Sequence, residues 1–198
     1  MSLELLTAFV VFAIATLFTP GPNNVMLMTS GLNFGFVRTL PHAFGVVLGF
    51  GFLVLVVGFG VGAFFEAYPA LYATIKFVGA AYLLYLAWMI AKSGPTKDGV
   101  RGRPLTFLEG AAFQWVNAKG WVMAVGAVTT YAAMAPFPLN IFLIAGIFAG
   151  FGILSSWTWL LFGTSLRPII SDPRKVRVFN VVMALALAAS LIPVFLEG

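Results

Sequence analysis

Two short polar stretches interrupt long apolar runs, and they carry the side chains best suited to hold a polar ligand. The first, residues 19–24, reads Thr-Pro-Gly-Pro-Asn-Asn and lies inside the apolar run 5–29. The second, residues 114–119, reads Gln-Trp-Val-Asn-Ala-Lys and lies inside the run 105–131. Backbone freed from helical hydrogen bonding is tolerated at bilayer depth only where it is buried in protein or lines a cavity. We therefore expect both stretches to face a common polar cavity near the middle of the membrane.

The first stretch predicts a break in a membrane helix. Pro20 and Pro22 lack a backbone donor and clash with the preceding turn, and Gly21 between them allows dihedral angles closed to other residues. A helix that restarts at Pro22 directs its first N–H groups into the break, where a carboxylate can bind. Asn23 and Asn24 add side-chain donors and acceptors, so all five residues are substrate-binding candidates. The alternative is a simple proline kink packed against a neighbouring helix.

The second stretch contains Lys119, the charged residue that lies farthest from a predicted membrane edge. A lysine at such depth costs roughly 2.5–3.5 kcal/mol on insertion scales, so we expect it to face a cavity or a partner. It could hold a substrate carboxylate or act as a proton-coupling residue. Gln114 and Asn117 are further substrate-binding candidates. The alternative is a lysine that extends along its stem toward the interface or donates to freed carbonyl groups.

Glu109 is a second candidate for proton coupling. It ends the pattern Thr106-Phe-Leu-Glu109 just after Pro104, which is a capping box at the predicted cytoplasmic start of a span. A carboxylate there complements the helix dipole, so the structural role is favoured. His42, which follows Pro41 at the start of another span, is expected to be an interfacial histidine.

The composition excludes several classes of protein. Of the 198 residues, 61% are hydrophobic and 9% are charged, whereas a soluble domain carries about 25% charged residues. With one histidine, no cysteine and six acidic residues, neither a metal site nor a set of nucleophile, base and acid can be assembled. We therefore expect no metal, no cofactor and no enzymatic activity. The net charge of +5 is interpreted as a signal for membrane orientation and not for nucleic acid.

Six apolar stretches approach or exceed the length of about 20 residues that crosses a bilayer. They are residues 5–29, 43–65, 75–91, 105–131, 139–161 and 178–195. The loops after the first, third and fifth hold nine of the eleven basic residues, namely Arg38, Lys92, Lys97, Arg101, Arg103, Arg167, Arg174, Lys175 and Arg177. The loops after the second and fourth hold only Glu66. Because cytoplasmic loops are rich in Lys and Arg, both termini are predicted to lie outside.

The six stretches predict one transmembrane domain over residues 1–198, with repeat 1 (1–91), a cytoplasmic linker (92–104) and repeat 2 (105–198). Three spans per repeat is an odd number, so the second repeat must cross the membrane inverted. A shift of 101 positions aligns Gly45 and Gly49 with Gly146 and Gly150, among other identities. The predicted fold class is an all-α integral membrane protein of six transmembrane helices in two inverted three-helix repeats, with helices 1 and 4 broken.

Breaks at corresponding positions of two repeats are typical of the binding site of a transporter. Such a protein would alternate its access to the two sides as one repeat rocks against the other. The Gly-xxx-Gly pairs allow close helix packing within or between subunits. They are therefore compatible with a homo-oligomer as well as with a monomer.

The stretch Phe18-Thr-Pro-Gly-Pro-Asn23 resembles the proline-glycine-proline signature of the LysE/RhtB family of amino-acid exporters. The resemblance covers essentially the whole chain and includes Gly35, Arg38, Gly45, Gly49 and residues 76–83 and 114–119. The family usually has Asn-Pro-Lys in the fourth span, where this chain has Asn117-Ala118-Lys119. The segment without that proline is most similar to the branch that exports cysteine and O-acetylserine.

The resemblance implies a secondary exporter of a small amino acid or derivative, of the cysteine/O-acetylserine or homoserine/threonine type. It implies a multi-pass protein of the bacterial cytoplasmic membrane that works by proton antiport, with the amino acid, protons and lipids as partners. The alternative is a passive amino-acid channel or facilitator that uses the same polar stretches as a constriction. A purely structural membrane partner would not need two polar interruptions at depth.

Overall fold

A computed structural model describes residues 2–61, 69–96, 99–170 and 172–192 of the chain. This part is helical apart from one short hairpin. Its elements are, in order, α1 (Leu3–Phe18), α2 (Pro22–Phe34), α3 (Phe36–Val56), η1 (Val57–Val61), α5 (Pro69–Lys92), β1 (Gly94–Thr96), β2 (Gly99–Arg101), α6 (Phe107–Phe113), η2 (Gln114–Val116), α7 (Ala118–Tyr131), η3 (Ala132–Met134), α8 (Leu139–Leu166) and α9 (Pro173–Ala189).

The first predicted span consists of two helices. α1 ends at Phe18, α2 begins at Pro22, and the pair is bent by 50° at the break. Pro22 occupies the first turn of α2, where the missing N–H needs no partner inside the helix. The predicted break at residues 19–24 is therefore confirmed.

The fourth predicted span is also broken, although residues 114–119 contain no proline. α6 ends at Phe113, and residues 114–116 form one 3₁₀ turn. Asn117 then leaves the helical region (φ −85°, ψ 98°) before α7 begins at Ala118. Asparagine is a preferred residue at helix starts, and here it takes that position without a proline beside it.

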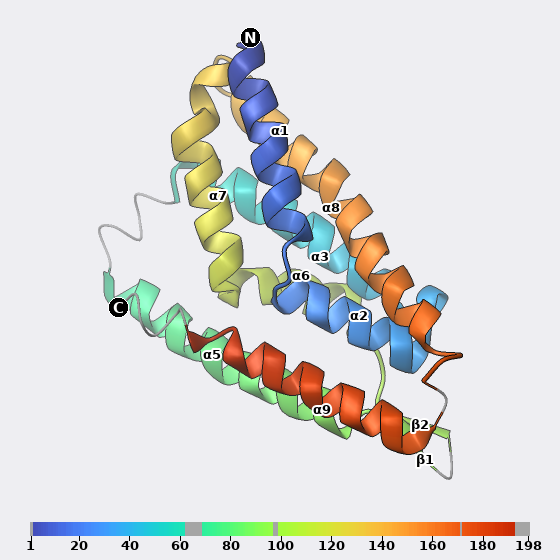
Figure 1. Cartoon of the computed structure of the whole chain (residues 1–198). Coiled ribbons are helices and arrows are strands. Elements are labelled where there is room, and N and C mark those ends of the chain that lie inside the picture. The colour runs from blue at the N-terminus through green and yellow to red at the C-terminus, as the bar shows by residue number, and fades with distance from the viewer. Residues whose placement is uncertain (1, 62–68, 97–98, 171, 193–198) are drawn as a thin grey trace.

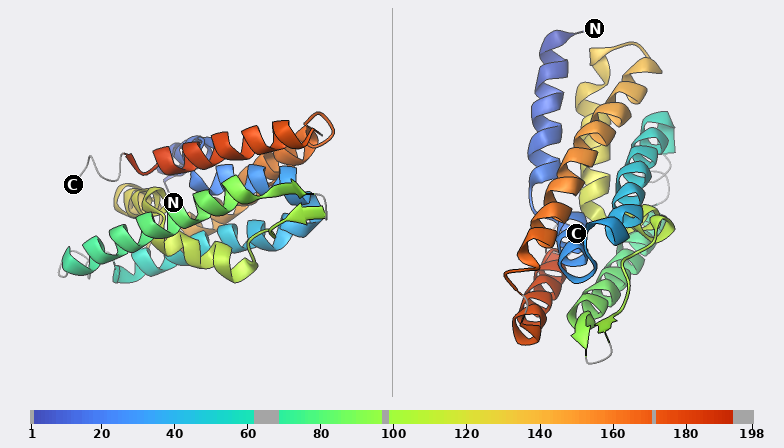
Figure 2. Two further views of the ribbon diagram at one scale, coloured as in Figure 1. Left: turned by 90° about the horizontal axis from the view of Figure 1, so that it is seen from below. Right: turned by 90° about the vertical axis from the view of Figure 1, so that its right-hand side faces the viewer.

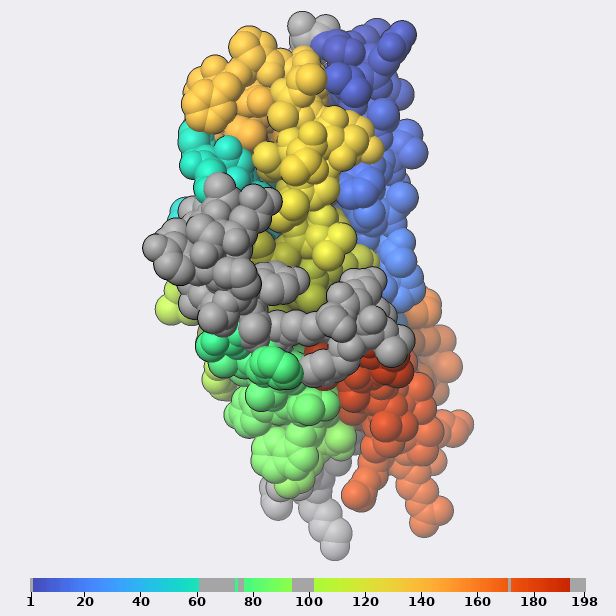
Figure 3. Space-filling view, turned by 90° about the vertical axis from the view of Figure 1, so that its left-hand side faces the viewer, coloured from blue at the N-terminus to red at the C-terminus, as the bar shows by residue number. Residues whose placement is uncertain are grey.

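The helices divide into two groups that lie at different ends of the molecule (Figures 1 and 2). α1, α3, α7 and α8 run together at one end, while α5 and α9 lie side by side at the other. α2 and α6, the continuations of the broken spans, lie between the two groups in Figure 1. On the face shown in Figure 3, α7 (yellow) lies beside α1 (blue), and the α5 (green) and α9 (red) pair lies below them.

Aromatic side chains form the centre of the larger group. Phe9 of α1, Phe50 of α3 and Phe148 of α8 are all buried. The ring of Phe148 meets Phe9 edge-on at a centroid distance of 5.0 Å and Phe50 at 5.1 Å. Edge-to-face pairs of this kind add to the stabilisation from burial. They join the first broken span to α3 and α8.

α3 and α6 approach so closely that only glycine fits at their contact, which we call the glycine seam. A Cβ atom on Gly45 would overlap the backbone of Phe107, and one on Gly49 would lie 2.5 Å from the Cα of Ala111. Membrane helices gain from such close contact because lipid offers no hydrophobic drive for their association. The seam joins predicted repeat 1 to predicted repeat 2.

A second close contact joins α2 to α8. A Cβ atom on Gly163 would overlap the carbonyl group of Met28. Gly146 and Gly150 behave differently, because a Cβ on either would meet no atom of the described chain within 4 Å. Of the two glycine pairs aligned by the shift of 101, only the first forms a helix contact within the described chain.

The predicted linker 92–104 contains a two-stranded antiparallel hairpin, β1 with β2. A buried amide cluster holds its start. Asn33 of α2 and Asn180 of α9 exchange hydrogen bonds of 2.8 and 3.0 Å, and Asn180 also donates to the carbonyl of Ser93 at 2.8 Å. The cluster thus ties α2, α9 and the linker together.

Two helices of the described chain are long and apolar enough to cross a membrane, Phe36–Gly60 and Leu139–Leu166. A third crossing results if the bent pair α1 and α2 counts as one span, and Phe77–Lys92 is a shorter apolar helix. The chain therefore has the apolar helices of an integral membrane protein. Six crossings and the inverted repeat stay predictions. The ends of the second and sixth predicted spans, together with Glu66 and Lys97, lie outside the described residues.

Candidate functional site

The two breaks meet through their amide side chains. Asn23 Nδ2 donates to Gln114 Oε1 at 2.9 Å, and Gln114 Nε2 donates to Asn23 Oδ1 at 3.1 Å. Gln114 is fully buried, and its Nε2 also donates to the carbonyl of Gly110 at 2.9 Å. Two interruptions separated by 91 residues therefore form a single polar centre.

Lys119 reaches across to the first break. Its Nζ donates to the carbonyl oxygen of Thr19 at 2.9 Å, a group that the break has freed from helical bonding. Gly21 makes room for this side chain, since a Cβ there would lie 3.0 Å from both Cδ and Nζ of Lys119. The lysine thus donates to a freed carbonyl, as the alternative above expects, and it does so at the wall of the cavity.

The carbonyls of Leu17 and Thr19 at the first break have further partners, on the same chain segment and on α8. Asn24 Nδ2 donates to the carbonyls of Leu17 and Thr19 at 2.9 and 3.0 Å. Ser155 Oγ of α8 donates to the Leu17 carbonyl at 2.7 Å. Asn24 therefore stabilises the broken backbone, and only Asn23 of the two asparagines reaches the second break.

The breaks border a cavity of about 50 Å³. It holds roughly three or four water molecules and is much smaller than the pockets of about 300–1,000 Å³ that hold drug-sized ligands. Its lining comes from α1, α2, α3, α7, α8 and the breaks: Thr16, Leu17, Gly21, Pro22, Asn23, Asn24, Val46, Val47, Phe50, Asn117, Lys119, Gly120, Met123, Phe148, Gly152, Ser155 and Ser156. Polar groups from the breaks and α8 face the same space as an apolar wall.

Two helices begin at this cavity, and neither start is capped by a side chain. Gly21 precedes α2, and Asn117 precedes α7, with no side-chain hydrogen bond to the first turn in either case. The first N–H groups of a helix have no partner inside it, and they carry partial positive charge. Both helix starts therefore offer donors to an anion in the cavity.

Asn117 also offers an acceptor. Its side chain is buried, lines the cavity, and its Oδ1 has no hydrogen-bond partner in the described chain. Nearly all buried polar atoms in proteins are paired, so this oxygen is an unsatisfied acceptor on a residue that lines the cavity. The site thus presents backbone donors at two helix starts and one unmatched acceptor on Asn117, at the start of α7.

Six of the eight predicted binding residues line the cavity: Gly21, Pro22, Asn23, Asn24, Asn117 and Lys119. Pro20 is exposed and Gln114 lies behind Asn23, so these two shape the site without lining it. The prediction omitted the walls from α3 and α8. Their one sequence signal is the adjacent pair Ser155 and Ser156 inside the apolar run 139–161.

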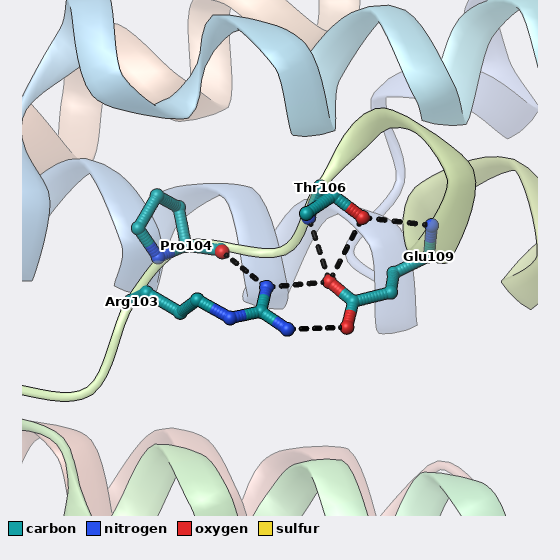
Figure 4. A network of polar contacts seen from close by, with 4 residues as sticks. All are labelled: Arg103, Pro104, Thr106 and Glu109. Carbon is teal, nitrogen blue, oxygen red and sulfur yellow. Dashed lines mark hydrogen bonds and ion pairs between the residues drawn. The ribbon is translucent and has the colours of Figure 1, made fainter.

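Glu109 is not among the residues that line the cavity. It forms the predicted capping box with Thr106 and a bidentate ion pair with Arg103, whose two N–O distances are 2.6 and 2.7 Å (Figure 4). Hydrogen bonding and charge from Glu109 raise the pKa of the Arg103 guanidinium. The capping role is confirmed, and every carboxylate oxygen already has a partner.

The structure buries His42 between helices, and its predicted position at the membrane interface stays a prediction. Its side chain has no exposed surface. The residue lies on α3 beside Gly110 of α6. Position along the chain indicates the end of a helix, whereas burial depends on which helix packs against it.

The chain is similar over nearly its whole length to a family of translocators. The family model described as LysE type translocator matches residues 14–193. The cysteine/O-acetylserine efflux proteins of Escherichia coli (strain K12) and Shigella sonnei (strain Ss046) are each 29% identical over 197 residues, which cover 98% of this chain and 100% of theirs. The protein of the same name from Shigella flexneri serotype 5b is 30% identical over 193 residues, or 96% of this chain and 97% of its own. No solved structure matches the chain.

Proposed function

This chain belongs to the LysE family of translocators, and from that premise we propose that it exports a small neutral amino acid of the cysteine or O-acetylserine type. Transport would be secondary, driven by proton antiport, and would proceed by alternating access in the bacterial cytoplasmic membrane with both termini outside. The observation that carries the proposal is the cavity at which two broken helices meet through Asn23 and Gln114. The names of the relatives supply the substrate type.

The substrate carboxylate would bind between the starts of α2 and α7. Free N–H groups and the helix dipoles favour an anion at both positions. Lys119 would exchange its hydrogen bond to the Thr19 carbonyl for a charge-assisted bond to the carboxylate, which is the stronger of the two. Discontinuous helices of transporters hold substrate carboxylates in this way.

The substrate ammonium group would bind Asn117 Oδ1, the buried acceptor that has no partner in the described residues. An ammonium group is a strong donor, and it removes the cost of leaving this oxygen unpaired. With the carboxylate and ammonium group both held, the side chain of the substrate points to the remaining wall.

That wall selects for size and charge. Val47, Phe50 and Phe148 are buried apolar side chains that line the cavity. A charged substrate side chain against them would lose its hydration without a partner. At the same cavity, the Ser155 hydroxyl, which already donates to the Leu17 carbonyl, would accept from a short polar side chain, and the Ser156 hydroxyl would accept or donate. The wall therefore favours small neutral amino acids.

A cavity of about 50 Å³ is too small for an amino acid together with its hydration water. Alternating access requires a second conformation in which the cavity is wider and open to one side. The Asn23–Gln114 pair joins repeat 1 to repeat 2 and would separate or rearrange in that conformation.

The test is a counterflow experiment with purified protein in proteoliposomes. Vesicles loaded with unlabelled O-acetylserine, cysteine, homoserine or threonine are diluted into trace labelled amino acid, with and without a pH gradient. Transient accumulation of label identifies a carrier and the preferred substrate, whereas a passive channel gives only equilibration. Absence of counterflow for all four amino acids would reject the proposed function.

The binding residues are tested in the same vesicles. Asn117→Ala removes the unmatched acceptor. The half-saturating concentration of the amino acid should rise about tenfold, which is the effect of one lost charge-assisted hydrogen bond. Thr129→Ala is the matched control, because Thr129 is an exposed residue of the same helix whose hydroxyl donates only within α7. Equal affinity of both variants would remove Asn117 from the binding site.

A further inference from the structure

His42 is a buried polar side chain that the proposed site does not use. It lies on α3 one turn before Val46, which lines the cavity, and its side chain has no exposed surface. Neither ring nitrogen has a hydrogen-bond partner in the described part of the chain. A neutral imidazole has one donor and one acceptor, so both remain unmatched. Packing alone would be served better by an apolar residue.

The imidazole lies at the glycine seam between α3 and α6. A Cβ on Gly110 would lie 3.1 Å from His42 Cδ2 and 2.9 Å from the His42 carbonyl oxygen. Gly110 must therefore be a glycine for α6 to cover the histidine ring. The seam has to open before water can reach the ring from this side.

Few charged groups surround the ring. On α6, Glu109 interacts electrostatically with His42, but both of its oxygens are bonded to Arg103. On α3, Arg38 is exposed one turn earlier, and on α7, Lys119 donates to the first break. Neither α2 nor α8 has a titratable side chain within its bounds. Neither ring nitrogen has an acceptor within hydrogen-bond reach in the described chain that would stabilise an imidazolium.

A buried charge without a partner is strongly unfavourable. The closed seam therefore accommodates neutral His42 and opposes its protonation, whereas an open and hydrated seam accommodates both forms. By linkage, a proton that binds only to the open form shifts the equilibrium toward that form. We propose that His42 is the proton-responsive residue of the transporter, and that its protonation opens the contact between α3 and α6.

The seam is connected to the binding cavity. The carbonyl of Gly110, beside His42, accepts from Gln114 Nε2, and Gln114 is paired with Asn23 at the cavity. Displacement of α6 from α3 therefore disturbs the pair that joins the two breaks. His42 would act as a positioning residue, through α6, and not by contact with the substrate. This role rests on the proposed function, because it assigns the proton step of the antiport.

The chain has no cysteine, so spin labels can be placed without removing native residues. Val37 on α3 and Leu108 on α6 are 76% and 74% exposed and serve as label sites after Val37→Cys and Leu108→Cys. Distances are measured in lipid nanodiscs between about pH 8 and pH 5, the range over which histidine titrates. We expect a longer distance to become populated as the pH falls. The shift should disappear in His42→Gln and persist in Glu109→Gln.

This measurement needs no substrate, so it stands apart from the proposed function. An unchanged distance distribution in the labelled protein with His42 would overturn the inference, whether or not His42→Gln folds. A shift retained in His42→Gln, or lost in Glu109→Gln, would also overturn it.

Transport provides the second readout. In proteoliposomes, His42→Gln should lose roughly tenfold in uptake driven by a pH gradient, within the usual range of coupling factors, while counterflow persists. Gradient-driven uptake that matches the parent would overturn the role of His42 and leave the exporter intact. Absence of transport by the parent protein would reject the proposed function, while the distance measurement would still decide the role of His42.

Discussion

Asn23 and Gln114 exchange two hydrogen bonds, so each amide acts as donor and acceptor toward the other. The residues come from the two broken spans, and they set the distance between the start of α2 and the end of α6. Gln114 Nε2 also donates to the carbonyl of Gly110, which fixes the orientation of Gln114 and, through the reciprocal pair, that of Asn23. This pair and the bond from Lys119 to the Thr19 carbonyl link the two breaks directly.

Removing one partner should therefore cost more than removing both. Gln114→Ala leaves Asn23 unmatched beside a buried space, and we expect a loss of about 1–3 kcal/mol in the free energy of unfolding. A double-mutant cycle with Asn23→Ala, measured by thermal unfolding in detergent, gives the coupling between the two side chains. Strictly additive losses would show that the pair does not interact.

Gly21→Ala tests the position of Lys119. The added methyl group would lie 3.0 Å from both Cδ and Nζ of the lysine, so the side chain must move away from the first break. We expect transport to fall about tenfold, since small displacements of a binding group have large effects. Gly126→Ala on α7 is the control, because a Cβ there meets no described atom within 4 Å. The transport rates of Gly21→Ala and Gly126→Ala are measured in parallel, and equal rates would contradict the prediction.

The close helix contacts predict an asymmetric response of glycines to alanine. Gly45→Ala and Gly163→Ala would force backbones apart, and each should destabilise the protein by about 1–3 kcal/mol or prevent folding. Gly146→Ala and Gly150→Ala are expected to fold normally, because each Cβ would point into space that the described chain leaves open. The yield of monodisperse protein and its melting temperature in one detergent compare the four variants.

Glu109→Gln separates the capping role from proton coupling. The substitution weakens an exposed ion pair and a capping box, and about 1 kcal/mol of stability should be lost. Transport driven by a pH gradient should remain, since Glu109 does not line the cavity. Loss of the pH-driven component with counterflow intact would instead assign the coupling proton to this carboxylate.

The predicted orientation can be tested with single cysteines in a chain that has none. Glu4 is exposed in the first turn of α1, and Arg174 is exposed at the start of α9. Glu4→Cys should react with a membrane-impermeant maleimide in intact cells, because the termini are predicted outside. Arg174→Cys should react only after permeabilisation. The reverse pattern would contradict the predicted orientation.

Local chemistry determined much of what the sequence predicted. A proline removes a backbone donor wherever it stands, so the break between Phe18 and Pro22 followed from residues 19–24 alone. The capping box of Thr106 and Glu109 is likewise a contact over three residues. The polar run 114–119 indicated the second break even without a proline. The length of the apolar stretches and the charges of the loops predicted a membrane protein. Each of these signals is also a local property of a short segment.

Only the tertiary structure decided which groups face one another. The burial of His42, the contact of Lys119 with the Thr19 carbonyl, and the cavity wall from Val47 and Ser155 all depend on how distant helices pack. That packing is set by close backbone contacts such as Gly163 against Met28. Gly146 has the same residue type and spacing but no such contact in the described chain. A glycine permits a close approach without specifying the partner, so the partner emerges only when the whole bundle packs.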